Sequence, residues 1–326
     1  IDAAAAMRDL TLSIVAQVVF GLPPDARSLA LLRAIRTWVE LFTAPSTNIL
    51  PLNVPGLPYW RLLRTSDALG AHLRALLAQR RAQLAPGLSA FDLLAQAQDA
   101  DGQPLSAEAV LGQASLLFVA GHETSANALV WTLVLLALHP RVCTELVDEV
   151  VGIVGRAAPA LEDLERLPLL DRVVRESLRL LPPAVYGVRH AQVAFSLGGY
   201  DLPAETTLIF SPFLTHRVSP VFERPAQFRP TRWETISPDP YEYIPFGAGP
   251  RRCLGETFAL QEIKTVLILL LQRFQPELVA PARIDYRARI TLSPAGTVPL
   301  RLRPLGEQIR PAKLTGSLRR LVDVPT

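Results

Sequence analysis

The sequence predicts a mainly α fold of the α+β class, in which long helices come first and small β-sheets follow. Apolar residues recur with helical spacing in most segments up to Leu181. From Val185 onward the pattern changes to short alternating segments bounded by turn residues, which is typical of hairpins. A chain of 326 residues can bury a large core, and its sequence contains neither an internal repeat nor a flexible linker.

The helical periodicity defines the expected helices. They cover residues 3–20, 22–42, 62–84, 90–98, 106–139 and 256–271, with further helices between 140 and 181. Ser106 is the expected N-cap of the longest helix, Glu108 lies in its first turn, and Pro140 ends it.

The expected strands lie between the last two groups of helices and at the end of the chain. Hairpin segments cover residues 193–197, 198–203 and 206–212, and a proline-rich meander follows over residues 219–245. The segment 288–303 is interpreted as a closing hairpin that turns around residues 294–296.

Composition excludes several classes of function. Cys143 and Cys253 are too few for a disulfide framework or a zinc cluster, which favours a reducing compartment and a cytoplasmic location. A net charge of +3 without a run of like charges gives no support for nucleic-acid binding. His122 and Glu123 interrupt the longest apolar stretch, so we expect no membrane anchor, and Ile1 does not open a signal peptide. Only two of the 33 basic residues are lysines, which indicates a G+C-rich bacterial genome.

The most informative segment is F-G-A-G-P-R-R-C-L-G, residues 246–255. A cysteine binds a metal only as the thiolate, and nearby cations or a helix N-terminus favour that form. Arg251 and Arg252 precede Cys253, and a predicted helix follows it. The glycines allow a sharp turn that brings backbone N–H groups close to a flat ligand. The alternative is a buried structural thiol.

This segment resembles the cysteine loop F-x-x-G-x-R-x-C-x-G of the cytochrome P450 haem-thiolate monooxygenases, at every fixed position. The resemblance implies a P450 fold with haem b as cofactor and Cys253 as the axial ligand of the haem iron. It also assigns Phe246, Arg251 and Gly255 to the haem-binding loop.

A second motif, A-G-H-E-T-S, lies in the middle of the longest predicted helix, where an acid and a hydroxyl are adjacent. The resemblance places Ala120, Gly121, Glu123 and Thr124 in the oxygen-activation groove above the haem, with Glu123 and Thr124 relaying protons. Gly121 costs the helix roughly 1 kcal/mol relative to alanine, which indicates a packing or ligand reason. The alternative is a solvated Glu on an ordinary core helix.

Further matches concern charged residues. Glu176 and Arg179 have the i, i+3 spacing of an ion pair on one helix face. The resemblance implies that this pair is buried and that Arg232 is a third member of the cluster. It implies a structural role for all three residues. It makes Arg189 and Arg251 the ligands of the haem propionates, since a guanidinium matches a carboxylate bidentately.

The function that the resemblance implies is insertion of one oxygen atom of O₂ into a small apolar substrate, by hydroxylation or epoxidation. Phe118, Val185, Tyr186 and residues 294–296 are expected to line the substrate site. The sequence has no flavin or nucleotide motif, so electrons from NAD(P)H are expected to arrive through a ferredoxin or flavodoxin and its reductase. Arg172, Arg175 and Arg252 are a candidate docking patch for an acidic donor.

The resemblance covers residues 1–303 and begins at a helix well inside the P450 fold. We therefore expect an N-terminally truncated catalytic domain of the bacterial soluble type, without the N-terminal strands and first helices. Residues 304–326 match nothing in the family and are expected to form a surface extension of unknown role. Three alternatives remain open: a peroxide-using haem-thiolate enzyme, a non-catalytic or haem-poor P450 fragment, and an unrelated helical binding protein.

Overall fold

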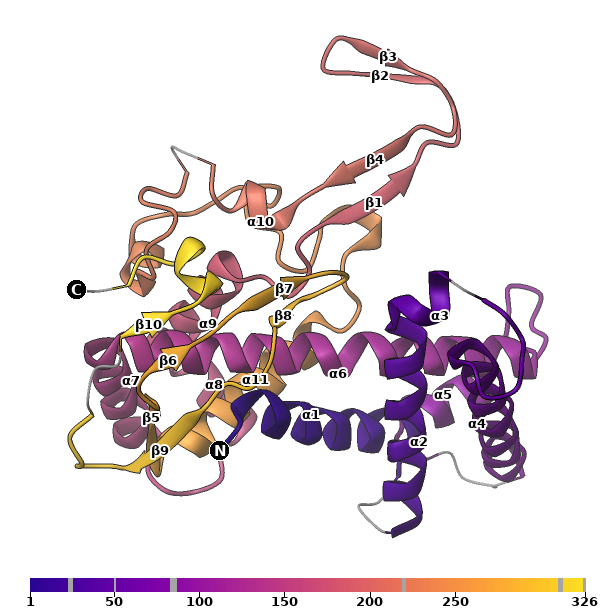
Figure 1. Cartoon of the computed structure of the whole chain (residues 1–326), viewed down its shortest axis with the longest axis horizontal. Helices are drawn as coiled ribbons and strands as arrows, with labels where there is room; N and C mark the ends of the chain where they lie inside the picture. Colours follow the sequence, from indigo (N-terminus) through magenta and orange to yellow (C-terminus); the bar gives the residue numbers. More distant parts are fainter. Residues whose placement is uncertain (23–25, 50, 83–86, 219–220, 310–312, 325–326) are drawn as a thin grey trace. The chain divides into compact units, whose positions relative to one another are not determined.

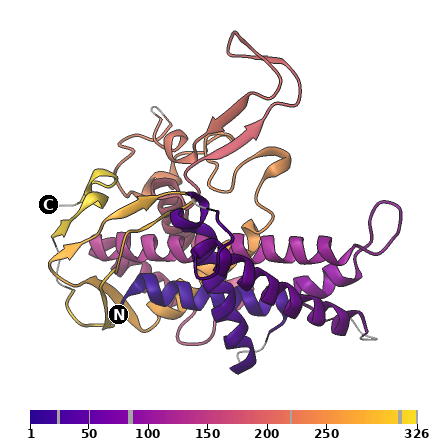
Figure 2. The same ribbon diagram turned by 45° about the vertical axis from the view of Figure 1, so that its right-hand side comes forward.

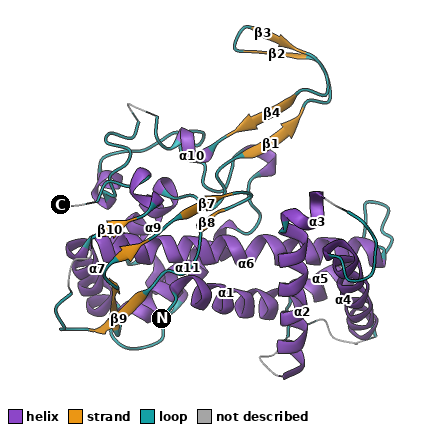
Figure 3. Cartoon of the chain, viewed as in Figure 1, coloured by secondary structure: helices purple, strands orange, loops and turns teal. Residues whose placement is uncertain are grey.

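The computed structural model describes residues 1–22, 26–49, 51–82, 87–218, 221–309 and 313–324, and Figures 1 and 3 show its elements. The helices are α1 (Ala3–Phe20), α2 (Ala26–Thr43), α3 (Pro45–Ile49), α4 (Pro58–Arg81), α5 (Ala90–Gln96), α6 (Ala107–Leu138), α7 (Pro140–Ile153), α8 (Leu161–Glu165), α9 (Pro168–Leu180), α10 (Pro212–Thr215), α11 (Glu256–Leu271) and the 3₁₀-helices η1 (Pro230–Glu234), η2 (Gly249–Arg251) and η3 (Ser317–Arg320). The strands are β1 (Gly187–His190), β2 (Phe195–Leu197), β3 (Tyr200–Leu202), β4 (Thr207–Phe210), β5 (Phe274–Leu278), β6 (Ala282–Arg283), β7 (Tyr286–Ala288), β8 (Leu292–Pro294), β9 (Leu300–Pro304) and β10 (Leu314–Thr315).

The order of the elements confirms the predicted mainly helical α+β class. The predicted helix 3–20 is confirmed at both ends, and the predicted helix 106–139 ends one residue earlier, at Leu138. Ser106 caps α6 as predicted, because its Oγ accepts a hydrogen bond from the N–H of Ala109 at 3.1 Å. The short helix α3 is not predicted by the sequence, and residue 84, the predicted end of the third helix, lies outside the described residues.

Contacts divide the chain into two compact units, a first unit of residues 1–8 and 124–326 and a second unit of residues 9–123. The second unit has an aromatic core, in which the ring centroids of Phe20 and Phe91 lie 5.7 Å apart and both side chains are buried. Helices α2 and α4 contact each other extensively in this unit, and α4 also contacts α5.

The first unit has its core along the C-terminal half of α6. Leu129, Trp131 and Leu133 in this half are at most 1% exposed. Pro140 cannot continue α6, and it occupies the first turn of α7 instead. Helices α7, α9 and α11 contact one another in this unit, and the hydroxyl of Thr132 on α6 donates a hydrogen bond to the Oγ of Ser177 on α9 at 2.7 Å.

Small two-stranded sheets make up the β part of the first unit. β1 pairs antiparallel with β4, and β2 pairs with β3 in a hairpin that extends away from α7, α9 and α11 of the same unit in both Figures 1 and 2. Gly187 lies opposite Phe210, and a Cβ at this glycine would lie 2.3 Å from the aromatic ring. The close approach of the ring therefore requires glycine at this position.

The predicted closing hairpin over residues 288–303 is wrong. β8 pairs with β7 and β9 pairs with β5, so the two halves of the segment belong to different sheets. Asp2 explains the difference, because its Oδ1 accepts a hydrogen bond from the N–H of Val298 at 2.9 Å and it forms a bridge with Pro299. Residues 298 and 299 therefore pair with Asp2, and not with the other half of the predicted hairpin.

The C-terminal tail is not a surface extension, contrary to the sequence-based expectation. Leu314, Leu318 and Val322 are at most 2% exposed, and β10 pairs parallel with β6. Gly316 has a φ of +91°, and a Cβ there would lie 2.4 Å from the carbonyl oxygen of Ile284. The tail is therefore packed closely into the first unit.

We predict that Leu318→Ala lowers the free energy of unfolding by about 3 kcal/mol, because a fully buried leucine is replaced by a cavity. Chemical denaturation of the purified chain measures this change. Arg319→Ala is the matched control, since Arg319 is exposed and belongs to the same 3₁₀-helix η3. Equal stability of the two variants would contradict the packed position of the tail.

The sequence predicts no membrane-spanning segment, but α1 is by itself long and apolar enough to cross a bilayer. The helices α6 and α7, bent by 112° at their junction, pass the same test together. Half of the most apolar window of α1 is buried in the protein, as is common for core helices.

Candidate functional site

The glycine-rich loop over residues 246–255 is held by its own backbone. The N–H of Cys253 donates a hydrogen bond to the carbonyl of Phe246 at 2.8 Å. Gly247 and Gly249 have φ values of +73° and +68°, a region that side chains with a Cβ rarely adopt. Phe246 is half-buried and Cys253 is exposed, so the loop presents its thiol at the surface.

Gly255 forms the N-cap of α11, directly after the cysteine. A Cβ at Gly255 would lie 3.9 Å from the Cys253 sulfur, so this position faces the thiol. The N-terminus of α11 and the sulfur are therefore close, as the sequence predicts.

Cys253 also lines a surface groove of about 950 Å³ between the start of α11 and helices α8 and α9. Leu254 is 89% exposed beside it. The charges on the groove are mixed, with more carboxylates than cations: Glu162, Glu165, Asp171 and Glu256 against Arg252 and Lys264.

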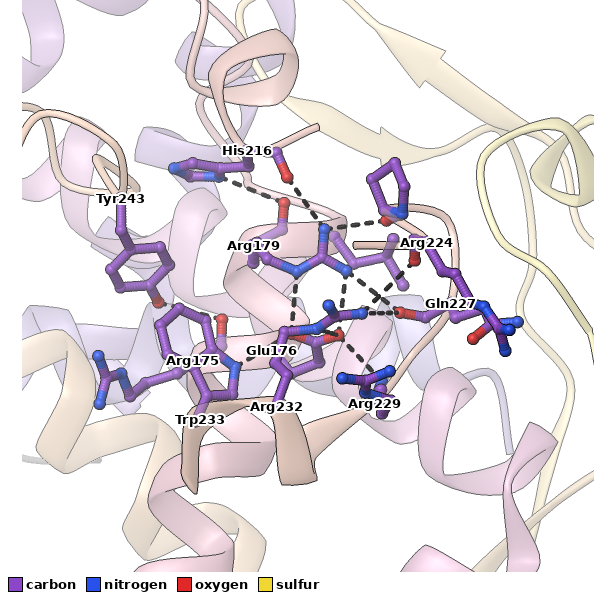
Figure 4. Close-up of polar contacts among 12 residues, drawn as sticks. Arg175, Glu176, Arg179, His216, Arg224, Gln227, Arg229, Arg232, Trp233 and Tyr243 are labelled. Atoms are coloured by element: carbon purple, nitrogen blue, oxygen red, sulfur yellow. Dashed lines mark hydrogen bonds and ion pairs between the residues drawn. The ribbon is translucent and has the colours of Figure 1, made fainter. Parts of the chain in front are cut away.

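A buried charge cluster lies around Glu176, as Figure 4 shows. Its carboxylate accepts hydrogen bonds from Arg179 at 2.9 and 3.0 Å and from Arg232 at 2.9 Å. All three side chains are at most 1% exposed. The structure thus brings together Glu176, Arg179 and Arg232, the three residues that the family resemblance grouped. The pair at i, i+3 spacing is buried here, whereas such pairs usually lie on the surface.

Two further members of this cluster, Arg229 and Trp233, are not predicted by the sequence. The N–H of Arg229 and the indole N–H of Trp233 donate to Glu176 at 2.9 and 3.0 Å. The remaining guanidinium N–H groups bind backbone carbonyls, and both arginines donate to the carbonyl of Gln227 at 3.2 Å. Every oxygen of the carboxylate therefore has at least two donors.

His216 connects this cluster to the segment that leads into the cysteine loop. Its Nδ1 donates to the carbonyl of Arg179 at 3.2 Å, and its Nε2 accepts from the N–H of Ile244 at 2.8 Å. These partners define the neutral tautomer. Burial lowers the pKa of His216 to about 3, and the charges of Arg179 and Arg217 act in the same direction.

Arg189 and Arg251, the two predicted propionate ligands, are both exposed. Arg189 lies on β1, where its guanidinium stands 5.2 Å from the centre of the Phe210 ring and donates to the carbonyl of Val188. Within the described part of the chain, neither guanidinium forms an ion pair with a protein carboxylate. Both charges are therefore available to an external carboxylate.

The predicted oxygen-activation residues lie on α6, where the two compact units adjoin in sequence. Glu123 and Thr124 are half-buried, and Ala120 is exposed. A Cβ at Gly121 would lie 3.4 Å from the side chain of Val15, which is an ordinary van der Waals distance, so packing against Val15 does not require glycine at this position. The packing reason for Gly121 is therefore not supported within the described part of the chain.

The predicted substrate contact at Phe118 is wrong. Phe118 is 1% exposed, and its ring packs against Phe20 at 5.6 Å in the core of the second unit. Ala184, next to Val185, forms a bridge with Thr291. The substrate contacts expected at Val185, Tyr186 and residues 294–296 stay predictions.

The three arginines of the predicted docking patch are largely occupied. Arg252 donates to Glu256 at 2.5 and 2.6 Å, Arg172 pairs with Glu234, and Arg175 lies 4.2 Å above the ring of Trp233. These partners, with the mixed charges of the groove beside Cys253, give little support to a docking site that is specific for an acidic surface.

Comparison with known proteins assigns the family. A family model described as Cytochrome P450 matches residues 1–297, and the chain belongs to this family. The putative cytochrome P450 136 of Mycobacterium tuberculosis is 31% identical over 307 residues, or 92% of this chain and 61% of that protein. Cytochrome P450 4c21 of Blattella germanica is 38% identical over 190 residues, or 57% of this chain and 38% of the insect protein. These relatives come from a bacterium and an insect, so the bacterial origin stays a prediction.

Solved structures confirm the predicted P450 fold. Retinoic acid bound cyanobacterial CYP120A1 aligns with a TM-score of 0.82 at 26% identity and covers 94% of this chain and 69% of that chain. The cytochrome P450DA heme domain aligns with a TM-score of 0.80 at 25% identity. The chain spans about three fifths or less of the length of the curated relatives quoted above.

The residues present fit the haem that the family implies. A haem held by a thiolate needs one protein sulfur on the iron and cationic partners for two carboxylates. Cys253 is an exposed thiol in an ordered loop, and Arg189 and Arg251 lack carboxylate partners among the described residues. No group of three or more His, Cys, Asp or Glu side chains in the described ranges is placed to bind a metal ion.

Proposed function

We propose that this chain is the haem-binding part of a haem-thiolate monooxygenase that inserts one oxygen atom of O₂ into a small apolar substrate by hydroxylation or epoxidation. The observation that carries the proposal is the exposed thiol of Cys253 in a glycine-shaped loop at the start of α11. When bound, haem with a thiolate ligand supplies the chemistry of O₂ activation.

The residues of the chain divide the remaining work. Cys253 binds the haem iron, with Phe246 and Gly255 forming its loop, and Arg189 and Arg251 bind the propionates as bidentate donors. On α6, Ala120 and Gly121 belong to the oxygen groove. For Gly121, this assignment is supported only by its position in the A-G-H-E-T-S motif. Glu123 and Thr124 relay protons in this groove, through the carboxyl group of Glu123 and the hydroxyl group of Thr124.

We further propose that residues 1–303 form the catalytic domain and that residues 304–326 are an extension that stabilises it. Electrons from NAD(P)H arrive through a ferredoxin or flavodoxin and its reductase, in the cytoplasm. The mixed charges of the groove beside Cys253 favour a partner surface that carries both signs of charge over a uniformly acidic one.

The carbon monoxide spectrum of the reduced protein tests the cysteine. We expect the strongly red-shifted Soret band of a thiolate ligand from the chain loaded with haem, and complete loss of this band in Cys253→Ser. Cys143→Ala is the matched control, because burial raises the pKa of the Cys143 thiol to about 12 and the side chain is fully buried. An unchanged spectrum in Cys253→Ser, or a chain that binds no haem, would refute the proposal.

A further inference from the structure

The C-terminal tail is bonded to the rest of the first unit at two separate places. At the first place, β10 pairs parallel with β6, and the two strands lie side by side in Figure 1. Just after β10, the N–H of Ser317 donates to Oδ1 of Asp285 at 2.7 Å, and its Oγ accepts from the N–H of Tyr286 at 3.0 Å. The residues after Arg320 take no part in these bonds.

The second place lies beside the buried charge cluster. The N–H of Asp323 donates to the carbonyl of Ala226 at 2.9 Å, and Asp323 forms a parallel bridge with Gln227. Val322, one residue earlier, is 2% exposed. The end of the tail, residues 321–323, therefore lies along residues 226–227 as a strand lies along its neighbour.

Residues 225–227 supply acceptors to both buried arginines of the cluster. The carbonyl of Gln227 accepts from Arg179 and from Arg232, each at 3.2 Å, as Figure 4 shows. The carbonyl of Pro225 accepts a further hydrogen bond from Arg179 at 2.9 Å. Both guanidinium groups are at most 1% exposed, so bulk water does not reach them to replace an acceptor that moves away. The position of this segment therefore decides whether these donors are satisfied.

Arg217 joins the end of the tail to the helix that carries the cluster. Its Nη2 donates to the carbonyl of Leu180 at 2.6 Å and to the carbonyl of Leu321 at 3.4 Å. Leu180 directly follows Arg179 and is the last residue of α9. Residues 321–323 are therefore bonded both to the end of α9, through Arg217, and to the segment that faces the two buried guanidinium groups.

We propose that residues 321–323 form a strap that positions residues 225–227 and so keeps the guanidinium groups of Arg179 and Arg232 against Glu176. The family match ends at residue 297, so the strap lies outside the matched residues, whereas the cluster lies wholly inside them. Asp323 is exposed and acts through its backbone N–H, and Val322 acts through burial. The strap therefore fixes a position without adding a charge to the cluster.

The strap is linked to the cysteine loop through the cluster. His216 binds the carbonyl of Arg179 and the N–H of Ile244, two residues before Phe246. We therefore expect a loosened strap to accelerate the loss of haem from the loaded chain. Only this expectation rests on the proposed function, because the contacts between the strap and the cluster involve residues of the chain alone.

Asp323→Pro tests the strap, because proline has no N–H to donate to Ala226. Asp323→Ala is the matched control, since it removes the same exposed side chain and keeps the N–H. The measurement is hydrogen exchange, by NMR on the full chain, of the Nε–H groups of Arg179 and Arg232, which both donate to Glu176 at 2.9 Å. Exchange is expected to be about three- to tenfold faster in the proline variant, the factor that the loss of one hydrogen bond produces, and unchanged in the alanine variant.

Two further measurements separate the strap from a general change in stability. The indole N–H of Trp131, which donates to the carbonyl of Leu292 at 2.9 Å in the same unit, should exchange at the wild-type rate in Asp323→Pro. A chain that ends at residue 320 keeps the buried Leu314 and Leu318 and should show the same acceleration at both arginines. Equal exchange in the two Asp323 variants, equal acceleration at Trp131, or wild-type exchange in the shortened chain would overturn the inference.

The chain loaded with haem separates this inference from the proposed function. Transfer of haem to an excess of apomyoglobin is expected to be faster from Asp323→Pro than from Asp323→Ala, and equal rates would contradict the link to the cysteine loop. If the exchange at the arginines responds to the strap but the wild-type chain gives no thiolate spectrum, the proposed function fails and the strap stands. A thiolate spectrum with equal exchange in both variants has the opposite meaning.

Discussion

Replacement of Glu176 by alanine is expected to lower the free energy of unfolding by about 3–5 kcal/mol, because it removes one partner of a fully buried ion pair. The carboxylate accepts hydrogen bonds from Arg179, Arg232, the backbone of Arg229 and the indole of Trp233. Without it, two guanidinium groups that are at most 1% exposed keep their charges and lose their counter-ion. Chemical denaturation measures the loss, and haem content after purification shows whether the cysteine loop survives it.

The control for this change is an exposed glutamate with the same kind of partner. Glu145 pairs with Arg141 at 3.0 Å, and the arginine side chain is 93% exposed. An exposed pair of this kind contributes about 0–1 kcal/mol, so Glu145→Ala should leave stability almost unchanged. If Glu176→Ala were as stable as Glu145→Ala, or if it kept full haem content, the structural role of the cluster would be wrong.

Acid is expected to destabilise this chain through His216. The unfolded chain binds a proton at the ordinary histidine pKa near 6.5, whereas burial lowers the pKa of His216 in the folded chain to about 3. Stability is therefore unaffected by this group above pH 6.5 and falls by about 1.4 kcal/mol for each pH unit below it, until about pH 3. In the folded chain, the Nε2 atom that a proton would bind also accepts a hydrogen bond from the N–H of Ile244.

His216→Gln is the variant that checks this slope, because an amide can still donate to one backbone group and accept from another. Its free energy of unfolding should be lower than that of wild type at pH 7 and should fall less steeply between pH 6 and pH 4. His72, exposed on α4, is the matched control, and His72→Gln should keep the wild-type slope. A wild-type slope in His216→Gln would contradict the tautomer assigned to the buried ring.

The sequence predicts the parts of the candidate site that depend on local spacing. Glu176 and Arg179 are three residues apart on one helix, so their contact follows from helix geometry. Arg232 is 56 residues from Glu176, and only the family resemblance indicated it. His216 and Trp233 act through backbone groups and a single indole N–H, and no periodicity or charge pattern marks such contacts in advance.

The two wrong predictions about the fold, the closing hairpin and the surface position of the tail, also concern contacts between residues that are far apart in the sequence. The turn residues at 294–296 are real signals of a reversal, but they do not specify which strand pairs with which. The partner of β9 is β5, and the loop between β8 and β9 is bonded to Asp2, almost 300 residues away. The family pattern gives no guide to the tail, because the tail lies outside it, and the buried residues Leu314 and Leu318 belong to two different short elements, β10 and η3, which are too short for a periodic apolar pattern to reveal.

The joining of residues 1–3 to residues 298–300 has a consequence for synthesis on the ribosome. Ala3 donates to the carbonyl of Val298 at 2.9 Å, and Leu300 donates to the carbonyl of Ile1 at 3.0 Å. Residues 1–3 are made long before residues 298–300, so these backbone partners are absent while most of the chain is synthesised, whereas the second unit, a continuous segment, is complete after residue 123. Residues 9–123 can therefore become ordered before residues 1–3 find their partners, and a nascent polypeptide halted before residue 298 leaves the first turn of α1 without these hydrogen bonds.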